Sequence, residues 1–401
     1  MRTILANLGW RVDALDVVET SVVATRDASV QPAVRATRWV FMVAGIGIAA
    51  WAPMVPYAKA RLGLDDGALG LVLLAFGGGS MVSMPLVGLL THHFGSRRMI
   101  VAGGMLACLA LPLLALASSA AALAAALAYF GASFGALDVA MNAHAVEVER
   151  RAQRPLMSGF HGMFSIGGLV GAAGISGLLA GGLPLPAAAA LAAALLLALL
   201  WRQRTALLRG IAAAERHAPF RLPHGVVWLL GVLCFISFLA EGSMLDWSAL
   251  LLREVHGFGV AAAGTGYAVF SVAMALGRVT GDRVVARCGR VATVRSGACV
   301  AAGGFLLAAF APWPAVVLAG FVLIGLGAAN IVPVMFGAAG RVPGMPPSIA
   351  LAMVTTLGYL GLLSGPALIG FVAHVSGLAL ALAGVAILLM VTAAAARVVR
   401  P

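Results

Sequence analysis

The sequence predicts an all-α membrane protein in which twelve transmembrane helices form two pseudo-symmetric six-helix bundles. Of the 401 residues, 62% are hydrophobic and 10% are charged, whereas soluble domains are about 45–50% apolar and about 25% charged. At about 20 apolar residues per bilayer crossing, this composition supplies about twelve helices with short connections. A similar basic turn in each half of the chain indicates an internal repeat.

Glycine, proline and charged residues interrupt the apolar segments and mark their ends. The predicted spans cover residues 38–58, 68–91, 98–117, 120–147, 156–181, 184–201, 225–252, 260–282, 291–311, 314–338, 347–373 and 376–396. The longest polar connection, residues 202–224, separates a bundle at 37–201 from a bundle at 225–397. Residues 1–36 contain acidic residues and no uninterrupted apolar segment, so we expect a disordered tail there.

The distribution of basic residues predicts the orientation, because loops rich in Lys and Arg stay in the cytoplasm. Of the 26 Lys and Arg residues, only Lys59, Arg61 and Arg253 fall on outer loops, and Arg278 falls within a span. We therefore expect the tail and both termini to be cytoplasmic. The same distribution accounts for the net charge of +12, so we expect no nucleic-acid partner.

A glycine-containing basic turn follows the second span of each half. The first reads GLLTHHFGSRR at residues 88–98, and the second reads GDRVVARCGR at residues 281–290. These turns resemble the G-x-L-x-D-R-x-G-R-R signature of the major facilitator superfamily. His92 stands where the first copy would carry the aspartate, and in the second copy Ala286 takes that position while Asp282 lies one helical turn earlier.

Further segments resemble one branch of that superfamily. GALDVAMN at residues 135–142 is similar to the G-x-x-[DE]-x-x-x-N segment of fucose-permease-like sugar/proton symporters. AEGSMLDW at 240–247 and GYLGLLSGP at 358–366 are also similar to segments of bacterial permeases. The resemblance covers residues 38–397 and implies a multi-pass transporter of the bacterial inner membrane.

Ionisable side chains within spans cost at least about 2.5–3.5 kcal/mol on insertion scales, so each needs a partner, a watery cavity or a function. Asp138 is the first candidate for proton coupling. Asn142, one turn later, shares its helix face, and a carboxyl group shielded from water can exchange a proton near neutral pH. Glu241, in the middle of the seventh span, is the second candidate. The alternative for Asp138 is a structural bond to a neighbouring helix.

Polar and aromatic side chains within the spans are candidates for substrate contact. They are Trp51, Asn142, His161, Asn330, Asp246 and Trp247. Asp246 is rotated from Glu241 by about 140° around the helix, so the two carboxylates are not expected to serve one small site. Packing is the alternative for His161, and anchoring at the membrane interface is the alternative for Trp247.

Charged residues near the cytoplasmic ends of the spans are candidates for gating. They are Arg97, Arg98, Glu149, Arg278, Asp282, Arg283, Arg287 and Arg290. Arg278 and Asp282 are one helical turn apart, so they can pair with each other or exchange to partners on other helices. For Glu149, the alternative is an ion pair at its own helix end with Arg150 or Arg151.

We expect a secondary active transporter, not an enzyme, that moves a small polar solute across the inner membrane by alternating access. The resemblance implies a sugar-like solute or another metabolite. No G-x-x-x-x-G-K-[ST] loop for ATP occurs, so protons are the expected driving ion. We expect a monomer in the lipid bilayer, without cofactor or metal. A drug or metabolite exporter and a non-transporting membrane sensor are the alternatives, but residues 202–224 are too short for a sensor's soluble domain.

Overall fold

The computed structural model describes residues 12–209, 225–258 and 265–400, and these ranges contain helices and no strand. Within them, eleven helices are long and apolar enough to cross a membrane. The twelfth, α11 (Thr265–Cys288), has comparable length but is less apolar because it carries Arg278, Asp282, Arg283 and Arg287. The predicted all-α architecture is confirmed.

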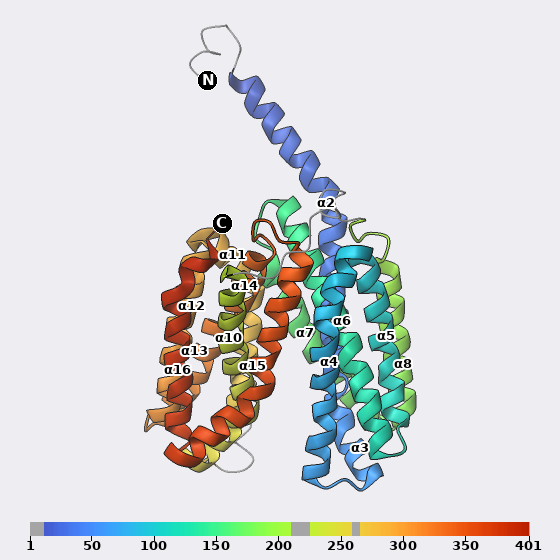
Figure 1. Cartoon of the computed structure of the whole chain (residues 1–401), viewed down its shortest axis with the longest axis vertical. Helices are drawn as coiled ribbons and strands as arrows, with labels where there is room; N and C mark the ends of the chain where they lie inside the picture. Colours follow the sequence, from blue (N-terminus) through green and yellow to red (C-terminus); the bar gives the residue numbers. More distant parts are fainter. Residues whose placement is uncertain (1–11, 210–224, 259–264, 401) are drawn as a thin grey trace.

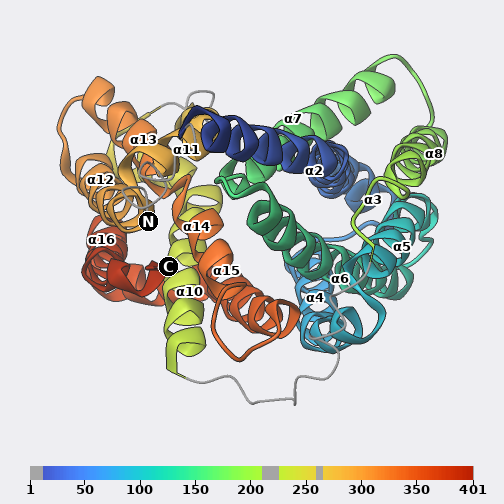
Figure 2. The ribbon, with the colours of Figure 1, turned by 90° about the horizontal axis from the view of Figure 1, so that it is seen from above.

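The helices form two lobes that lie side by side (Figures 1 and 2). The N lobe contains α2 (Val12–Ala49), α3 (Val55–Leu62), α4 (Asp66–Phe94), α5 (Ser96–Leu116), α6 (Ala120–Ala152), α7 (Met157–Ala180) and α8 (Leu185–Gln203). The C lobe contains α10 (Gly225–Leu250), α11, α12 (Arg290–Phe310), α13 (Pro314–Ala328), α14 (Ile331–Ala339), α15 (Pro347–Ser376) and α16 (Leu378–Ala395). The start of α2 and the end of α16 lie at one end of the molecule, which we call the terminal face; α3 lies at the opposite end (Figure 1).

Equivalent helices pair in the two lobes, as expected for a repeat. α2 packs on α7 in the N lobe, and α10 packs on α15 in the C lobe. Gly45 faces the backbone of Phe164 at the first crossing, and Gly361 faces the backbone of Phe235 at the second. A Cβ at either glycine would collide with that backbone, so both crossings depend on small residues, as helix contacts in membranes commonly do.

The two basic turns also adopt the same backbone conformation. Gly95 alone joins α4 to α5 with φ 85° and ψ 147°, and Gly289 alone joins α11 to α12 with φ 80° and ψ 160°. A positive φ of this kind favours glycine, because a Cβ would clash with the backbone. Each turn reverses the chain direction within one residue, so the next helix begins at the terminal face.

The N-terminal boundary differs from the expected one. α2 begins at Val12, and Val30, Val34 and Phe41 are buried in the core. Their spacing of four and seven residues places them on one helix face, so the first span extends before residue 38. Residues 30–36 therefore belong to the first span and not to the expected tail, and α2 continues back to Val12. Residues 1–11 lie outside the described part of the chain.

Two other segments refine the expected organisation. Residues 204–209 follow α8 and contain the buried Leu207, while the rest of the expected linker, 210–224, lies outside the described residues. The tenth span is divided into α13 and α14 at Ala329 and Asn330. Pro333 lies in the first turn of α14. Because proline has no backbone N–H, it cannot donate a helical hydrogen bond to the carbonyl of Ala329.

Candidate functional site

A buried ion pair lies near the middle of the molecule. Nη2 of Arg278 on α11 donates to both carboxylate oxygens of Glu241 on α10, at 3.1 and 3.2 Å. The Arg278 side chain is 9% exposed and that of Glu241 is 27% exposed. Because arginine keeps its charge in proteins, Glu241 supplies the counter-charge that permits this burial.

Arg278 also joins the two lobes. Its Nη1 donates to Oγ of Ser165 on α7, at 3.2 Å. Its Nε is buried and has no hydrogen-bond partner within the described structure. A guanidinium that bonds both lobes and keeps a donor unsatisfied can change partners when a polar solute or water enters.

A group of aromatic side chains from both lobes packs around His161. His161, one turn before Ser165, donates from Nδ1 to the carbonyl of Met157 at 2.9 Å. Its ring centroid lies 5.3 Å from that of Phe41 and 5.8 Å from that of Phe336. The group continues through two further rings, with centroid distances of 6.4 Å from Phe336 to Phe238 and 5.6 Å from Phe238 to Tyr359.

Asp138 forms a second buried polar site in the N lobe. It is 7% exposed, and Asn142 is fully buried. Nδ2 of Asn142 donates to the Asp138 carboxylate at 3.3 Å and to the Asp138 carbonyl at 2.9 Å, so the two side chains meet as their spacing predicts. Within the described residues, no Lys or Arg forms an ion pair with Asp138.

Glu149 closes the terminal face from the N-lobe side. Its Oε1 accepts from Nη1 of Arg341 at 2.9 Å and lies 3.9 Å from Nη2 of Arg290, and both arginines belong to the C lobe. Its Oε2 accepts from the backbone N–H groups of Leu156 and Met157, at 2.8 and 3.0 Å. A carboxylate at these N–H groups is also stabilised by the dipole of α7.

Asp282 makes the reciprocal contact from the C-lobe side. Its Oδ2 accepts from the backbone N–H of Gly159 on α7, at 3.0 Å, while its Oδ1 is buried without a partner in the described structure. Arg278 and Asp282 thus take different partners on other helices and do not pair with each other. We call Glu149, Arg290, Arg341 and Asp282 the latch.

The other charged residues at the ends of α6 and α11 lie outside the latch. The ion pair at the end of α6 belongs to Glu147, which binds Arg150 and Arg151 at 2.7 and 2.6 Å, and not to Glu149. Arg283 and Arg287, two expected gating residues, are exposed on α11. Neither forms an ion pair with the N lobe in the described structure, so the structure does not support a latch role for them.

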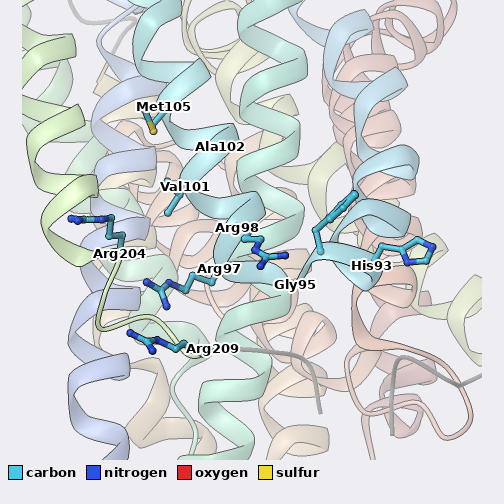
Figure 3. Close-up of a pocket in the computed structure, with 10 residues that line it drawn as sticks. His93, Gly95, Arg97, Arg98, Val101, Ala102, Met105, Arg204 and Arg209 are labelled. Atoms are coloured by element: carbon cyan, nitrogen blue, oxygen red, sulfur yellow. The ribbon is translucent and has the colours of Figure 1, made fainter. Parts of the chain in front are cut away.

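The remaining expected gating residues also lie apart from the latch. Arg97 and Arg98 line a pocket of the N lobe together with Arg204 and Arg209 (Figure 3). All four residues belong to the N lobe or to the segment that follows it, and none of the described lining residues comes from the C lobe. The gating prediction for this pair therefore receives no support from the geometry.

Three of the expected substrate residues have structural contacts, and a fourth is exposed. Trp51 is buried in an apolar cluster of the N lobe, and Trp247 lies against Gly370 of α15. Nδ2 of Asn330 donates to the carbonyl of Gly277 at 3.1 Å and so ties the break between α13 and α14 to α11. Asp246 is exposed near the far end of α10. Of the expected set, only His161 lies beside the central ion pair, while Asn142 supports Asp138.

The sequence analysis missed Arg341, Ser165 and the aromatic group. One signal could have identified Arg341: it ends the fourth span of the C lobe, just as Glu149 lies near the end of the fourth span of the N lobe. The others carry no such signal, because single Ser and Phe residues are ordinary components of transmembrane helices.

Known proteins match this chain over most of its length. The family model of the Major Facilitator Superfamily matches residues 39–339. An uncharacterised MFS-type transporter of Yersinia pestis is 48% identical over 375 residues, covering 92% of this chain and 97% of that protein. The membrane protein MosC of Rhizobium meliloti is 32% identical over 349 residues, covering 87% and 86%. The crystal structure of the Escherichia coli fucose:proton symporter FucP has a similar fold, with a TM-score of 0.74 at 17% identity, covering 92% and 98%.

Proposed function

Because the chain belongs to the major facilitator superfamily, we propose that it is a proton-coupled secondary transporter of a small, hydroxyl-rich solute. The observation that carries this proposal is the contact of Arg278 with Glu241 in one lobe and with Ser165 in the other. A solute that accepts these hydrogen bonds would replace the direct contact between the lobes by a contact that the solute bridges. Binding energy can drive alternating access in this way.

The chemistry around Arg278 favours a sugar or another polyol. Arg278 offers donors and Glu241 offers acceptors, so adjacent hydroxyl groups can bond to both at once. Phe336, Phe238 and Tyr359 of the aromatic group provide flat apolar surfaces, and a sugar presents C–H groups to such surfaces. The similarity in fold to a fucose:proton symporter supports the same class of solute.

Asp138 is the proposed proton carrier. Its partner is the neutral amide of Asn142, which can bond to the carboxyl group in either protonation state. Glu241 differs because its partner, Arg278, carries a permanent charge that needs a counter-charge.

The latch would set the state of the transport cycle. With both termini on the cytoplasmic side of a bacterial inner membrane, as the basic loops indicate, the terminal face is the cytoplasmic face. The bonds of Glu149 and Asp282 then hold the cytoplasmic side closed. Opening toward the cytoplasm requires both carboxylates to leave their partners in the opposite lobe.

The test is uptake into proteoliposomes with an imposed proton gradient, using a panel of radiolabelled sugars and polyols. We expect accumulation of at least one of them above its external concentration, and we expect collapse of the gradient to abolish it. Asp138→Asn should lose this accumulation and retain solute exchange without a gradient. Unchanged proton-driven accumulation in Asp138→Asn would refute the proton-carrier assignment, and exchange of none of the panel would refute the solute class.

A further inference from the structure

A strongly basic pocket lies at the terminal face of the N lobe, apart from the sites described above. It has a volume of about 740 Å³. Four arginines line it: Arg97 and Arg98 from the first turn of α5, and Arg204 and Arg209 from the segment that follows α8 (Figure 3). None of the described residues that line it is acidic.

The charges of this pocket are largely uncompensated. Within the described structure, Arg97, Arg98 and Arg209 form no ion pair or side-chain hydrogen bond. Arg204 lies over the ring of Trp201 at 3.8 Å and donates to its carbonyl, and neither contact neutralises its charge. The N-terminus of α5 adds backbone N–H groups, because its N-cap residue, Gly95, has no side chain to bond them.

A second basic pocket, beside the turn at Gly289, provides an internal contrast. Arg290 and Arg295 of α12 line it together with Arg154 of the N lobe. There Arg290 lies beside Glu149, and Nε of Arg295 donates to the carbonyl of Ala393 at 3.4 Å. Arg290 and Arg295 thus have partners within the protein, whereas Arg97 and Arg98 have none in the described structure and can bind a ligand.

An apolar track continues from the arginines along α5. Val101, Ala102 and Met105 line the inner part of the pocket. Beyond them, Leu106, Leu109 and Leu113 are 44%, 45% and 48% exposed on the same helix. Spacings of three and four residues place these leucines along one stripe, which leads from the basic end into the depth of the bilayer.

We propose that this pocket binds an anionic phospholipid. Its phosphate lies among the arginines at the N-terminus of α5, and one acyl chain follows the leucine stripe. Arginine bonds phosphate oxygens in a bidentate manner, helix N-termini attract anions, and basic pockets between transmembrane helices are typical headgroup sites. A free phosphate ion would use the arginines alone and would not need the apolar track, which is why the geometry favours a lipid.

The test measures lipid binding to purified, delipidated protein by native mass spectrometry, with phosphatidylglycerol as the anionic probe and phosphatidylcholine as the zwitterionic one. We expect preferential retention of phosphatidylglycerol. Arg97→Gln with Arg98→Gln should weaken its binding about tenfold or more. Arg397→Gln with Arg400→Gln removes the same number of exposed charges from the end of the chain, and this control should bind like the parent protein.

A second variant separates charge from shape. Ala102→Trp fills the pocket and keeps every arginine, so it should also weaken phosphatidylglycerol binding, and added inorganic phosphate should not displace the lipid. Equal binding by the Arg97/Arg98 variant and the control, or equal binding of both lipids, overturns the proposal. Displacement by phosphate together with full binding in Ala102→Trp would identify a free-anion site instead.

Discussion

Asp138 in the N lobe and Glu241 in the C lobe are carboxylates within membrane-spanning helices, and the two differ in their partners. Asp138 in the N lobe bonds a neutral amide one turn away on its own helix. Glu241 in the C lobe bonds a guanidinium on another helix, which also contacts the opposite lobe. A carboxyl group beside an amide can gain or lose a proton without leaving a charge unpaired, whereas one beside arginine cannot. This difference is the basis for the proposal that Asp138 carries the proton and that Glu241 binds the solute.

Neutralising each carboxylate in turn is the most direct test of whether Asp138 and Glu241 have different roles. Asp138→Asn should abolish proton-driven accumulation and keep solute exchange, while Glu241→Gln should reduce both by about a hundredfold, because Arg278 loses its counter-charge and the site loses an acceptor. Parallel uptake and counterflow assays in proteoliposomes measure the two activities. If both variants lose the same activity to the same extent, the two carboxylates do not have separate roles.

The ion pair itself can be tested by a double-mutant cycle on stability. Arg278→Gln leaves the Glu241 carboxylate without its partner, and we expect a loss of about 2–3 kcal/mol, below the range for fully buried pairs because Glu241 is 27% exposed. Glu241→Gln with Arg278→Gln should recover much of that loss. Thermal unfolding of purified protein gives the values, and additive losses would show that the two side chains do not interact.

The latch extends the comparison to the terminal face. Removal of Arg341 leaves Glu149 with its backbone partners and the longer contact to Arg290, so we expect the closed state to lose about 1.5–3 kcal/mol, the range for a charged hydrogen bond. Ser158→Cys, at a buried position beside the latch, reports opening through its rate of reaction with a water-soluble thiol reagent. Cys288 and Cys299 are exposed and would be replaced by serine in this background.

We expect Arg341→Gln to raise that labelling rate about tenfold or more, as a shift of 1.5 kcal/mol or above implies. Arg283→Gln removes an exposed arginine outside the latch and should leave the rate unchanged. A similar rate increase in both variants would attribute the effect to surface charge in general and not to the bond with Glu149.

The smallest effect is expected at Asn142. Asn142→Ala removes one hydrogen bond to the Asp138 side chain and one to the Asp138 backbone, which should lower stability by about 1–2 kcal/mol and slow proton-driven uptake without affecting exchange. Ser133→Ala provides a matched control. Ser133 is a buried residue of the same helix, and its hydroxyl donates to the backbone carbonyl of Tyr129, one turn earlier. Equal effects on uptake in the two variants would show that Asn142 has no specific role in proton coupling.

The helices could be predicted closely and the site only in part. The end of the second predicted span and the single-residue turn after it follow from Gly95, whose role depends on local backbone geometry. Asp138 and Asn142 meet because four residues make about one helical turn. Val30 and Val34 were misassigned to a tail because charged residues before them hide an apolar stripe that becomes clear only when it packs against the core.

The amino-acid sequence by itself determined the membrane-spanning segments, the repeat and the positions of the costly buried charges, because each of these depends on composition and on spacing along one chain. Tertiary structure alone decided the partners. Arg278 and Asp282 are correctly spaced to pair with each other, yet Arg278 bonds Glu241 and Asp282 bonds Gly159. Which groups a buried charge meets depends on the rotation and depth at which helices cross, and close packing between distant segments sets both.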